Sequence, residues 1–80
     1  IEDNCWIASG SVIAGEAIVK NNCFLGVNTT IVNKVTIDKF NIVGANSMIS
    51  KNTKENEVYL SRSAEKHRFG STDYAKFFGI

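Results

Sequence analysis

The chain has 80 residues, with nine basic and eight acidic side chains and a net charge of +1. This length allows one domain at most, and the balanced charge lacks the basic footprint of nucleic-acid-binding domains. No apolar run approaches the roughly 20 residues of a membrane span, and no signal peptide is recognisable. We therefore expect a cytoplasmic protein with no nucleic-acid partner and no membrane span.

An aliphatic residue recurs at every sixth position across residues 1–54. The nine positions are Ile1, Ile7, Ile13, Val19, Leu25, Ile31, Ile37, Val43 and Ile49. Helices repeat their apolar positions every three or four residues and half-buried strands every two, so a period of six fits neither. It is typical of a flat-sided solenoid with three short strands per turn. The nine hexapeptide repeats therefore predict three coils of 18 residues.

Small residues form a second column, two positions before each aliphatic residue. The column is Cys5, Ser11, Ala17, Cys23, Thr29, Val35, Asn41, Ser47 and Thr53. Positions two apart on a strand share a face, so these side chains should also point inward. Asn41 is the large exception, and it needs a hydrogen-bond partner. Cys5 and Cys23 should stack on adjacent coils as buried thiols, with a disulfide as the alternative.

Glycine or asparagine recurs near the predicted corners between strands. The positions are Asn4, Gly10, Gly15, Asn22, Asn28, Asn33, Asn46 and Asn52. These residue types tolerate positive φ, which a sharp corner requires.

Stacking every eighteenth residue assigns the outward side chains to three faces. The first face carries Trp6, Phe24 and Ile42 beside a column of Ala8, Gly26 and Gly44. This stripe is too apolar for a small monomer to leave in water. We expect it to be covered, either by another part of the protein or by a second copy of the solenoid.

The hexad rhythm stops at Glu55, which divides the chain into a β-helix over residues 1–54 and a tail over residues 55–80. Val58–Leu60 forms a short extended run. Ser71 or Thr72 can cap a helix over residues 73–78 with an aromatic side. We expect this tail to fold back over the open end of the solenoid or onto a neighbour.

The repeats resemble the bacterial hexapeptide-repeat acyltransferases. Ile7–Gly15 is similar to the stretch that follows the catalytic histidine in sugar acetyltransferases of the sialic-acid and bacillosamine type. Residues 25–30 and 43–48 are similar to the later coils of that family, where coenzyme A lies. The resemblance implies an all-β fold, a left-handed parallel β-helix with a short C-terminal helical tail, that assembles as a homotrimer. It also implies acetyl-CoA as the acyl donor and a sugar or nucleotide-sugar as the acceptor.

The same resemblance assigns roles to four residues. The backbone N–H near Gly15 would stabilise an oxyanion, and Gly26, Gly44 and Ala45 would line the groove for the pantetheine arm of coenzyme A. The family's general-base histidine falls just before the residue that corresponds to Ile1, so we expect a C-terminal portion that is inactive alone. One departure is the absence of proline from the turn after the last coil.

The sequence also bears on a catalytic role for its single histidine, on metal binding and on a non-catalytic function. His67 is the only histidine, and it lies in the tail, where a surface role is favoured over that of a general base reaching across a trimer. No Cys or His cluster has metal-binding spacing, which argues against a zinc site and against a carbonic anhydrase on this fold. A non-catalytic β-solenoid for trimerisation or assembly remains the alternative function.

Overall fold

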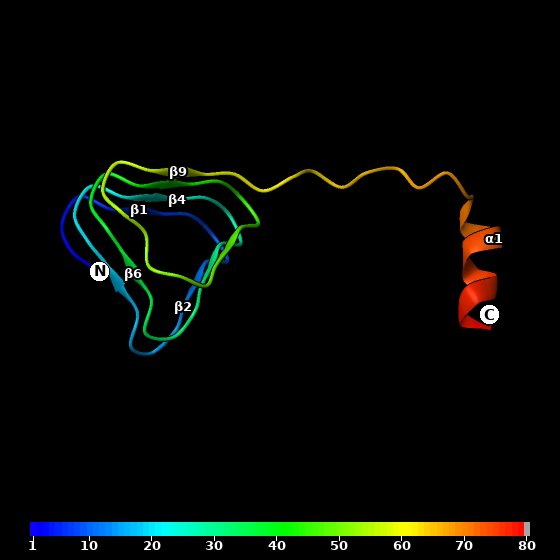
Figure 1. Ribbon diagram of the computed structural model, residues 1–80, viewed down its shortest axis with the longest axis horizontal. Coiled ribbons are helices and arrows are strands. Elements are labelled where there is room, and N and C mark those ends of the chain that lie inside the picture. Colours follow the sequence, from blue (N-terminus) through cyan, green and yellow to red (C-terminus); the bar gives the residue numbers. More distant parts are fainter. Residues whose placement is uncertain (80) are drawn as a thin grey trace.

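The computed structural model describes residues 1–79 as a short solenoid followed by an extended tail and a helix (Figure 1). Each strand has two residues. The strands are β1 (Trp6–Ile7), β2 (Val12–Ile13), β3 (Ile18–Val19), β4 (Phe24–Leu25), β5 (Thr30–Ile31), β6 (Thr36–Ile37), β7 (Ile42–Val43), β8 (Met48–Ile49) and β9 (Val58–Tyr59). The tail ends in the helix α1 (Ser71–Ala75) and a 3-10 turn η1 (Lys76–Phe78).

The strands form three parallel sheets, one on each face of the solenoid. Their orders are β1-β4-β7-β9, β2-β5-β8 and β3-β6. Trp6 pairs with Phe24 and Phe24 with Ile42, so successive coils are 18 residues apart in the chain. The expected three-coil parallel β-solenoid with a short C-terminal helix is confirmed.

The aliphatic column forms the core from Val19 onward, whereas Ile7 and Ile13 in the first coil are half-buried and Ile1 is exposed. Val19, Leu25, Ile31, Ile37 and Val43 are fully buried, and Ile49 is nearly so. Full burial of such a side chain contributes roughly 1.5–3 kcal/mol, so the column is the main source of stability in the coils.

Several members of the small inward column join adjacent coils by side-chain hydrogen bonds. The Ser11 hydroxyl donates to the Gly26 carbonyl at 3.1 Å, and the Cys23 thiol donates to the Asp38 carbonyl at 3.0 Å. The Asn41 amide Nδ2 donates to the Lys54 carbonyl at 2.9 Å, which confirms the predicted need for a partner. Both cysteines are free thiols, and burial raises the pKa of Cys23.

The corner prediction holds only in part. Positive φ occurs at five of the expected positions, which are Asn4, Gly10, Asn22, Asn28 and Asn46. It is wrong for Gly15, Asn33 and Asn52, while Lys34 and Phe40 adopt positive φ instead. Asn33 and Asn52 act through their side chains instead. Their Oδ1 atoms accept hydrogen bonds from the N–H groups of Glu16 and Thr36, respectively.

The strand pairing runs past the expected boundary at Lys54. Val43 pairs with Tyr59, so β9 lies only 16 residues after β7 instead of 18. The turn before β9 is therefore two residues shorter than the regular hexads predict. The division into residues 1–54 and 55–80 stays a prediction, with β9 belonging to the first-face sheet.

The tail does not fold back over the open end of its own solenoid (Figure 1), so this part of the expectation is wrong, whereas its contact with a neighbour stays a prediction. Residues 60–70 are exposed, and they carry α1 away from the coils (Figure 1). The helix begins at Ser71, two residues before the predicted start, and its N-cap is Gly70 with no side-chain cap. No residue of α1 is buried, so the helix makes no packed contact with the coils.

Candidate functional site

The first face of the solenoid carries a continuous apolar stripe of Trp6, Phe24, Ile42 and Val58. These side chains are exposed, Trp6 by 66% and Phe24 by 42%. The Trp6 and Phe24 rings stack, with centroids 6.4 Å apart and planes 10° apart. The predicted stripe is therefore present, and β9 extends it by one residue.

Gly26, Gly44 and Ala45 come together at the corner where the first face meets the second. The Gly26 N–H donates to the Val43 carbonyl at 2.8 Å, so consecutive coils are in backbone contact there. A Cβ atom on Gly26 would lie 2.6 Å from the backbone nitrogen of Ala45. Gly26 is buried, and its missing side chain lets the next coil approach. The space at Gly26 is therefore filled by this chain's own backbone rather than left as a groove.

The surface of this corner belongs to Gly44 and Ala45. Gly44 is half-buried and Ala45 is exposed. A Cβ atom on Gly44 would lie 3.1 Å from Cδ2 of Leu60, which is the end of an exposed side chain. A slender ligand could lie along Gly44 and Ala45 once Leu60 moves aside.

Gly15 lies at a different corner, between β2 and β3 in the first coil. It is exposed, and an added Cβ would meet no atom within 4 Å. Within residues 1–79 its N–H forms no hydrogen bond, so this donor is free for an incoming oxygen. The structure does not bring Gly15 to the corner of Gly44 and Ala45 within one chain.

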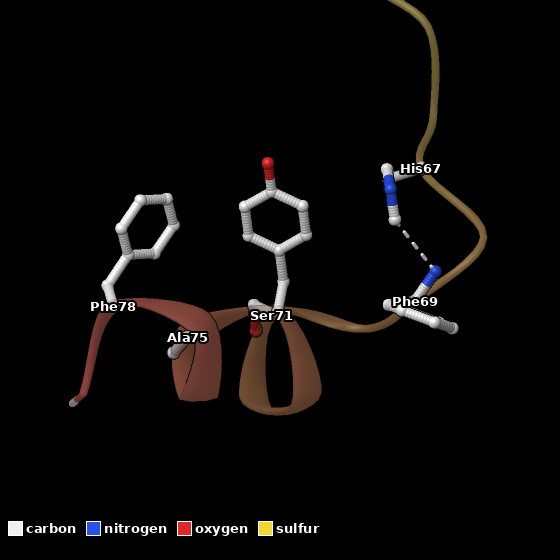
Figure 2. A pocket seen from close by; sticks show the side chains of 6 residues that line it. His67, Phe69, Ser71, Ala75 and Phe78 are labelled. Atoms are coloured by element: carbon white, nitrogen blue, oxygen red, sulfur yellow. Dashed lines mark hydrogen bonds between the residues drawn. The ribbon is translucent and has the colours of Figure 1, made fainter.

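His67 belongs to an aromatic cluster on the tail, shown in Figure 2. Its Nδ1 atom accepts a hydrogen bond from the Phe69 N–H at 3.1 Å. Its ring meets Tyr74 edge to face, with centroids 4.8 Å apart. The tail segment that carries His67 leaves the solenoid, so it lies apart from the coils that contain Gly15 and Gly44 (Figure 1).

Sequence reasoning missed a hydrogen-bonded clamp at the short turn before β9. The Tyr59 hydroxyl and the Lys54 N–H both donate to Oε1 of Glu57, each at 2.7 Å. These bonds lower the pKa of Glu57, first through the Tyr59 hydroxyl, and the same bond raises the pKa of Tyr59. Periodicity gave no signal for it because the clamp lies where the hexads stop.

The described residues contain neither a metal-binding cluster nor a membrane-spanning helix. Residues 1–79 hold no group of three or more His, Cys, Asp or Glu side chains placed to bind a metal ion. No helix among these residues combines the length and the apolar character needed to cross a bilayer.

The chain is similar in sequence to curated bacterial proteins named Bifunctional protein GlmU. It is 40% identical over 52 residues to those of Desulfitobacterium hafniense strains DSM 10664 / DCB-2 and Y51, a match that spans 65% of this chain and 12% of each relative. It is 38% identical over 50 residues to that of Psychrobacter sp. strain PRwf-1. The chain thus spans about one eighth of the length of these relatives. No protein-family model matches it.

Proposed function

We propose that this chain is the acetyl-CoA-binding part of a sugar or nucleotide-sugar O- or N-acetyltransferase. The observation that carries the proposal is the solenoid itself, whose repeats are 40% identical over 52 residues to the GlmU proteins. That similarity supports an acetyltransferase part. The choice of a sugar acceptor of the sialic-acid or bacillosamine type rests on the resemblance of residues 7–15, and the expected cytoplasmic location belongs to the same proposal.

The proposed reaction is direct acetyl transfer. A histidine outside this sequence takes the proton from the acceptor hydroxyl or amine, and the acceptor attacks the thioester carbonyl. The free N–H at Gly15 donates to the oxygen that becomes negatively charged. Gly44 and Ala45, with Gly26 beneath them, form the wall along which the pantetheine arm lies. Direct transfer then releases coenzyme A as the thiol.

The proposed site needs more than one copy of the chain. Gly15 and Gly44 lie at different corners of one solenoid, so an oxyanion donor and a pantetheine wall can meet only between copies. The stripe of Trp6, Phe24, Ile42 and Val58 supports a copy-to-copy contact, because its exposure in water is unfavourable. We therefore propose a homotrimer with the site between neighbours.

Calorimetric titration with coenzyme A tests the proposal. The unchanged chain should bind, and Gly44→Val should lose binding because the added side chain blocks the wall. Circular dichroism should show that Gly44→Val keeps its coils, because the tightest contact of the added Cβ, at 3.1 Å, is with the movable end of Leu60, and its distance of 3.4 Å to the Tyr59 carbonyl oxygen is an ordinary contact.

The matched control is Ser50→Val. Ser50 is exposed on the second face, and Val32 occupies the equivalent position one coil earlier, so valine fits there. This variant should bind like the unchanged chain. Equal binding by Gly44→Val would remove the groove assignment. Absence of binding by the unchanged chain would favour a non-catalytic assembly module.

A further inference from the structure

In each coil, backbone N–H groups donate to carbonyls of the following coil. The last complete coil has no following coil, so its N–H groups on each face need other acceptors. On the first face β9 provides the acceptors. The N–H groups of Ile42 and Gly44 donate to the carbonyls of Glu57 and Tyr59 at 3.0 and 2.7 Å. β7 is therefore closed by this chain.

On the third face side chains replace the missing strand. The N–H of Thr36 donates to Oδ1 of Asn52 at 2.8 Å, and the N–H of Asp38 donates to Oγ1 of Thr53 at 2.9 Å. β6 is therefore closed as well.

The edge of β8 on the second face has no such closure. In the two earlier coils, the N–H groups of Val12 and Thr30 donate to carbonyls of the following coil at 2.8 and 2.9 Å. Met48 is the next residue in this column, and its N–H forms no hydrogen bond within residues 1–79. The N–H of Ser50 is equally unused.

A third unused donor lies below this edge. Ser11 and Thr29 hold equivalent positions in the earlier coils, and their hydroxyls donate to carbonyls of the following coil at 3.1 and 3.3 Å. Ser47 is next in that column and is only 8% exposed, yet its buried Oγ has no partner. A buried donor left unpaired costs about 1–3 kcal/mol, so an acceptor is missing here.

The unused donors of Ser47 and Met48 face a recess, and Ser50 lines the adjoining one together with Met48 and Tyr59. The recess is lined by Ser47, Met48, Ile49, Tyr59, Leu60 and Ser61, and β9 stands beside it one strand higher than β8. The donors of Met48 and Ser50 are two residues apart, which matches the spacing of carbonyls along one side of an extended strand. Within the described part of the chain, the N–H groups of Val58 and Leu60 on the outer edge of β9 are unused as well, but the β8 edge differs because a buried hydroxyl, that of Ser47, is left without a partner beneath it.

The chain's own next residues are unsuited to this recess. If the chain continued around the solenoid with the 16-residue step that separates β7 from β9, Arg62 would take the corner position that Asn46 holds one coil below. Asn46 has positive φ. Glu65 would fall at the inward position of Ile49, placing a carboxylate over the apolar core. Both are unfavourable, and the chain instead continues straight from β9 (Figure 1).

We propose that residues 61–66 of a second copy lie on the edge of β8 as an added parallel strand. These residues are exposed, and their N–H groups form no hydrogen bond within residues 1–79. They leave the solenoid at the height of β9, one strand above β7 and β8. In a neighbour related by an axis parallel to the solenoid, the vacant position above β8 lies at this same height. The inference rests on the homotrimer of the proposed function.

Threefold symmetry also gives the required direction. The three faces of a triangular solenoid are related by the same turn as three copies around a threefold axis. The rotation that relates one copy to the next therefore makes a first-face strand of the first copy parallel to a second-face strand of its neighbour. A tail that continues the line of β9 runs parallel to β8 of the next copy.

Amide hydrogen exchange of the full chain tests this strand addition. Sedimentation first sets concentrations at which the chain is assembled and dissociated. The N–H groups of Met48 and Ser50 should exchange at least about tenfold more slowly in the assembly. Ser50→Pro should abolish the protection at Met48 without removing an internal hydrogen bond, whereas Ser50→Ala should keep it.

A mixing experiment identifies the occupant. Chains labelled with ¹⁵N are mixed with unlabelled chains that carry a nitroxide at Ser63→Cys in a Cys5→Ser, Cys23→Ser background. The assembly should show broadened Met48 and Ser50 signals. Broadening only when both labels are on the same chain would overturn the inference in favour of the chain's own tail.

Other outcomes separate this inference from the proposed function. A trimer with unprotected Met48 and Ser50 would overturn the strand addition alone. A monomer at every concentration would overturn both the strand addition and the homotrimer. Coenzyme A binding, measured separately, decides the acetyltransferase proposal.

Discussion

The solenoid and the tail use similar proportions of apolar side chains to opposite effect. In the coils each aliphatic residue meets its counterpart one coil away, so Leu25 and Ile31 are completely buried. In the tail Phe77 and Phe78 are 72% and 68% exposed, and the aromatic rings contact mainly one another. The difference shows that repetition, not composition, buries apolar surface in this chain, because only a repeated unit provides a partner at fixed spacing.

Leu25→Ala should have the largest effect on stability. It removes a fully buried side chain from the middle coil, and the free energy of unfolding should fall by about 2–5 kcal/mol. Leu60→Ala is the matched control, because Leu60 is 79% exposed and its loss should change stability by less than about 0.5 kcal/mol. Denaturant unfolding followed by circular dichroism measures both. Similar losses would contradict the division into a stabilised solenoid and an unsupported tail.

Phe24→Asp should show that the first-face stripe, and not the aromatic cluster of the tail, holds the assembly together. Phe24 lies at the centre of the first-face stripe, where burial of a large apolar side chain contributes roughly 1.5–3 kcal/mol per copy. Self-association measured by sedimentation should weaken at least about tenfold. Phe77→Asp introduces the same charge on the tail and should leave association nearly unchanged. A stable micromolar monomer formed by the unchanged chain would contradict the homotrimer itself.

Gly26→Ala and Gly44→Ala compare two glycines of one column. The Cβ of Gly26→Ala would collide with the Ala45 backbone, and overpacking of this kind costs about 1–3 kcal/mol. The Cβ of Gly44→Ala would press only on the movable end of Leu60 and would make an ordinary contact with the Tyr59 carbonyl oxygen at 3.4 Å, so we expect a loss below about 1 kcal/mol. Thermal and denaturant unfolding should rank the variants in that order. The reverse order would show that the corner of Gly44 is the tighter of the two.

The smallest expected effect is a loss of stability at alkaline pH, caused by the buried thiol of Cys23. Burial raises the pKa of Cys23, so above about pH 8.5 the unfolded chain loses this proton while the folded chain retains it. The free energy of unfolding should therefore decrease as pH rises through this range, by less than about 1.4 kcal/mol per pH unit.

Two serine variants identify the group that causes this pH dependence of the free energy of unfolding. Cys23→Ser should reduce it while keeping a hydroxyl that can donate to the Asp38 carbonyl. Cys5→Ser should retain it. A slope unchanged by Cys23→Ser would assign the alkaline effect to another group, with Tyr59 the first alternative because its pKa is also raised.

The regular part of the fold was accessible from the amino-acid sequence. A six-residue period with Leu, Ile or Val at one position and a small residue two positions earlier has one economical arrangement, a three-sided coil with both columns inside. The pairing of Trp6 with Phe24 and the burial of Asn41 with its hydrogen-bond partner follow from that arrangement. Each of these features depends on spacing along the chain.

The end of the solenoid and the shape of the candidate site were decided by tertiary contacts. The 16-residue step to β9, the Glu57–Tyr59 clamp and the open edge of β8 depend on which hydrogen bonds the last coil can still complete. The packing of Gly26 against Ala45 and the separation of Gly15 from Gly44 likewise depend on coil heights and corners. A periodic pattern specifies how one coil follows another, but the last coil has no successor, so its free donors and the departing tail are set by three-dimensional packing alone.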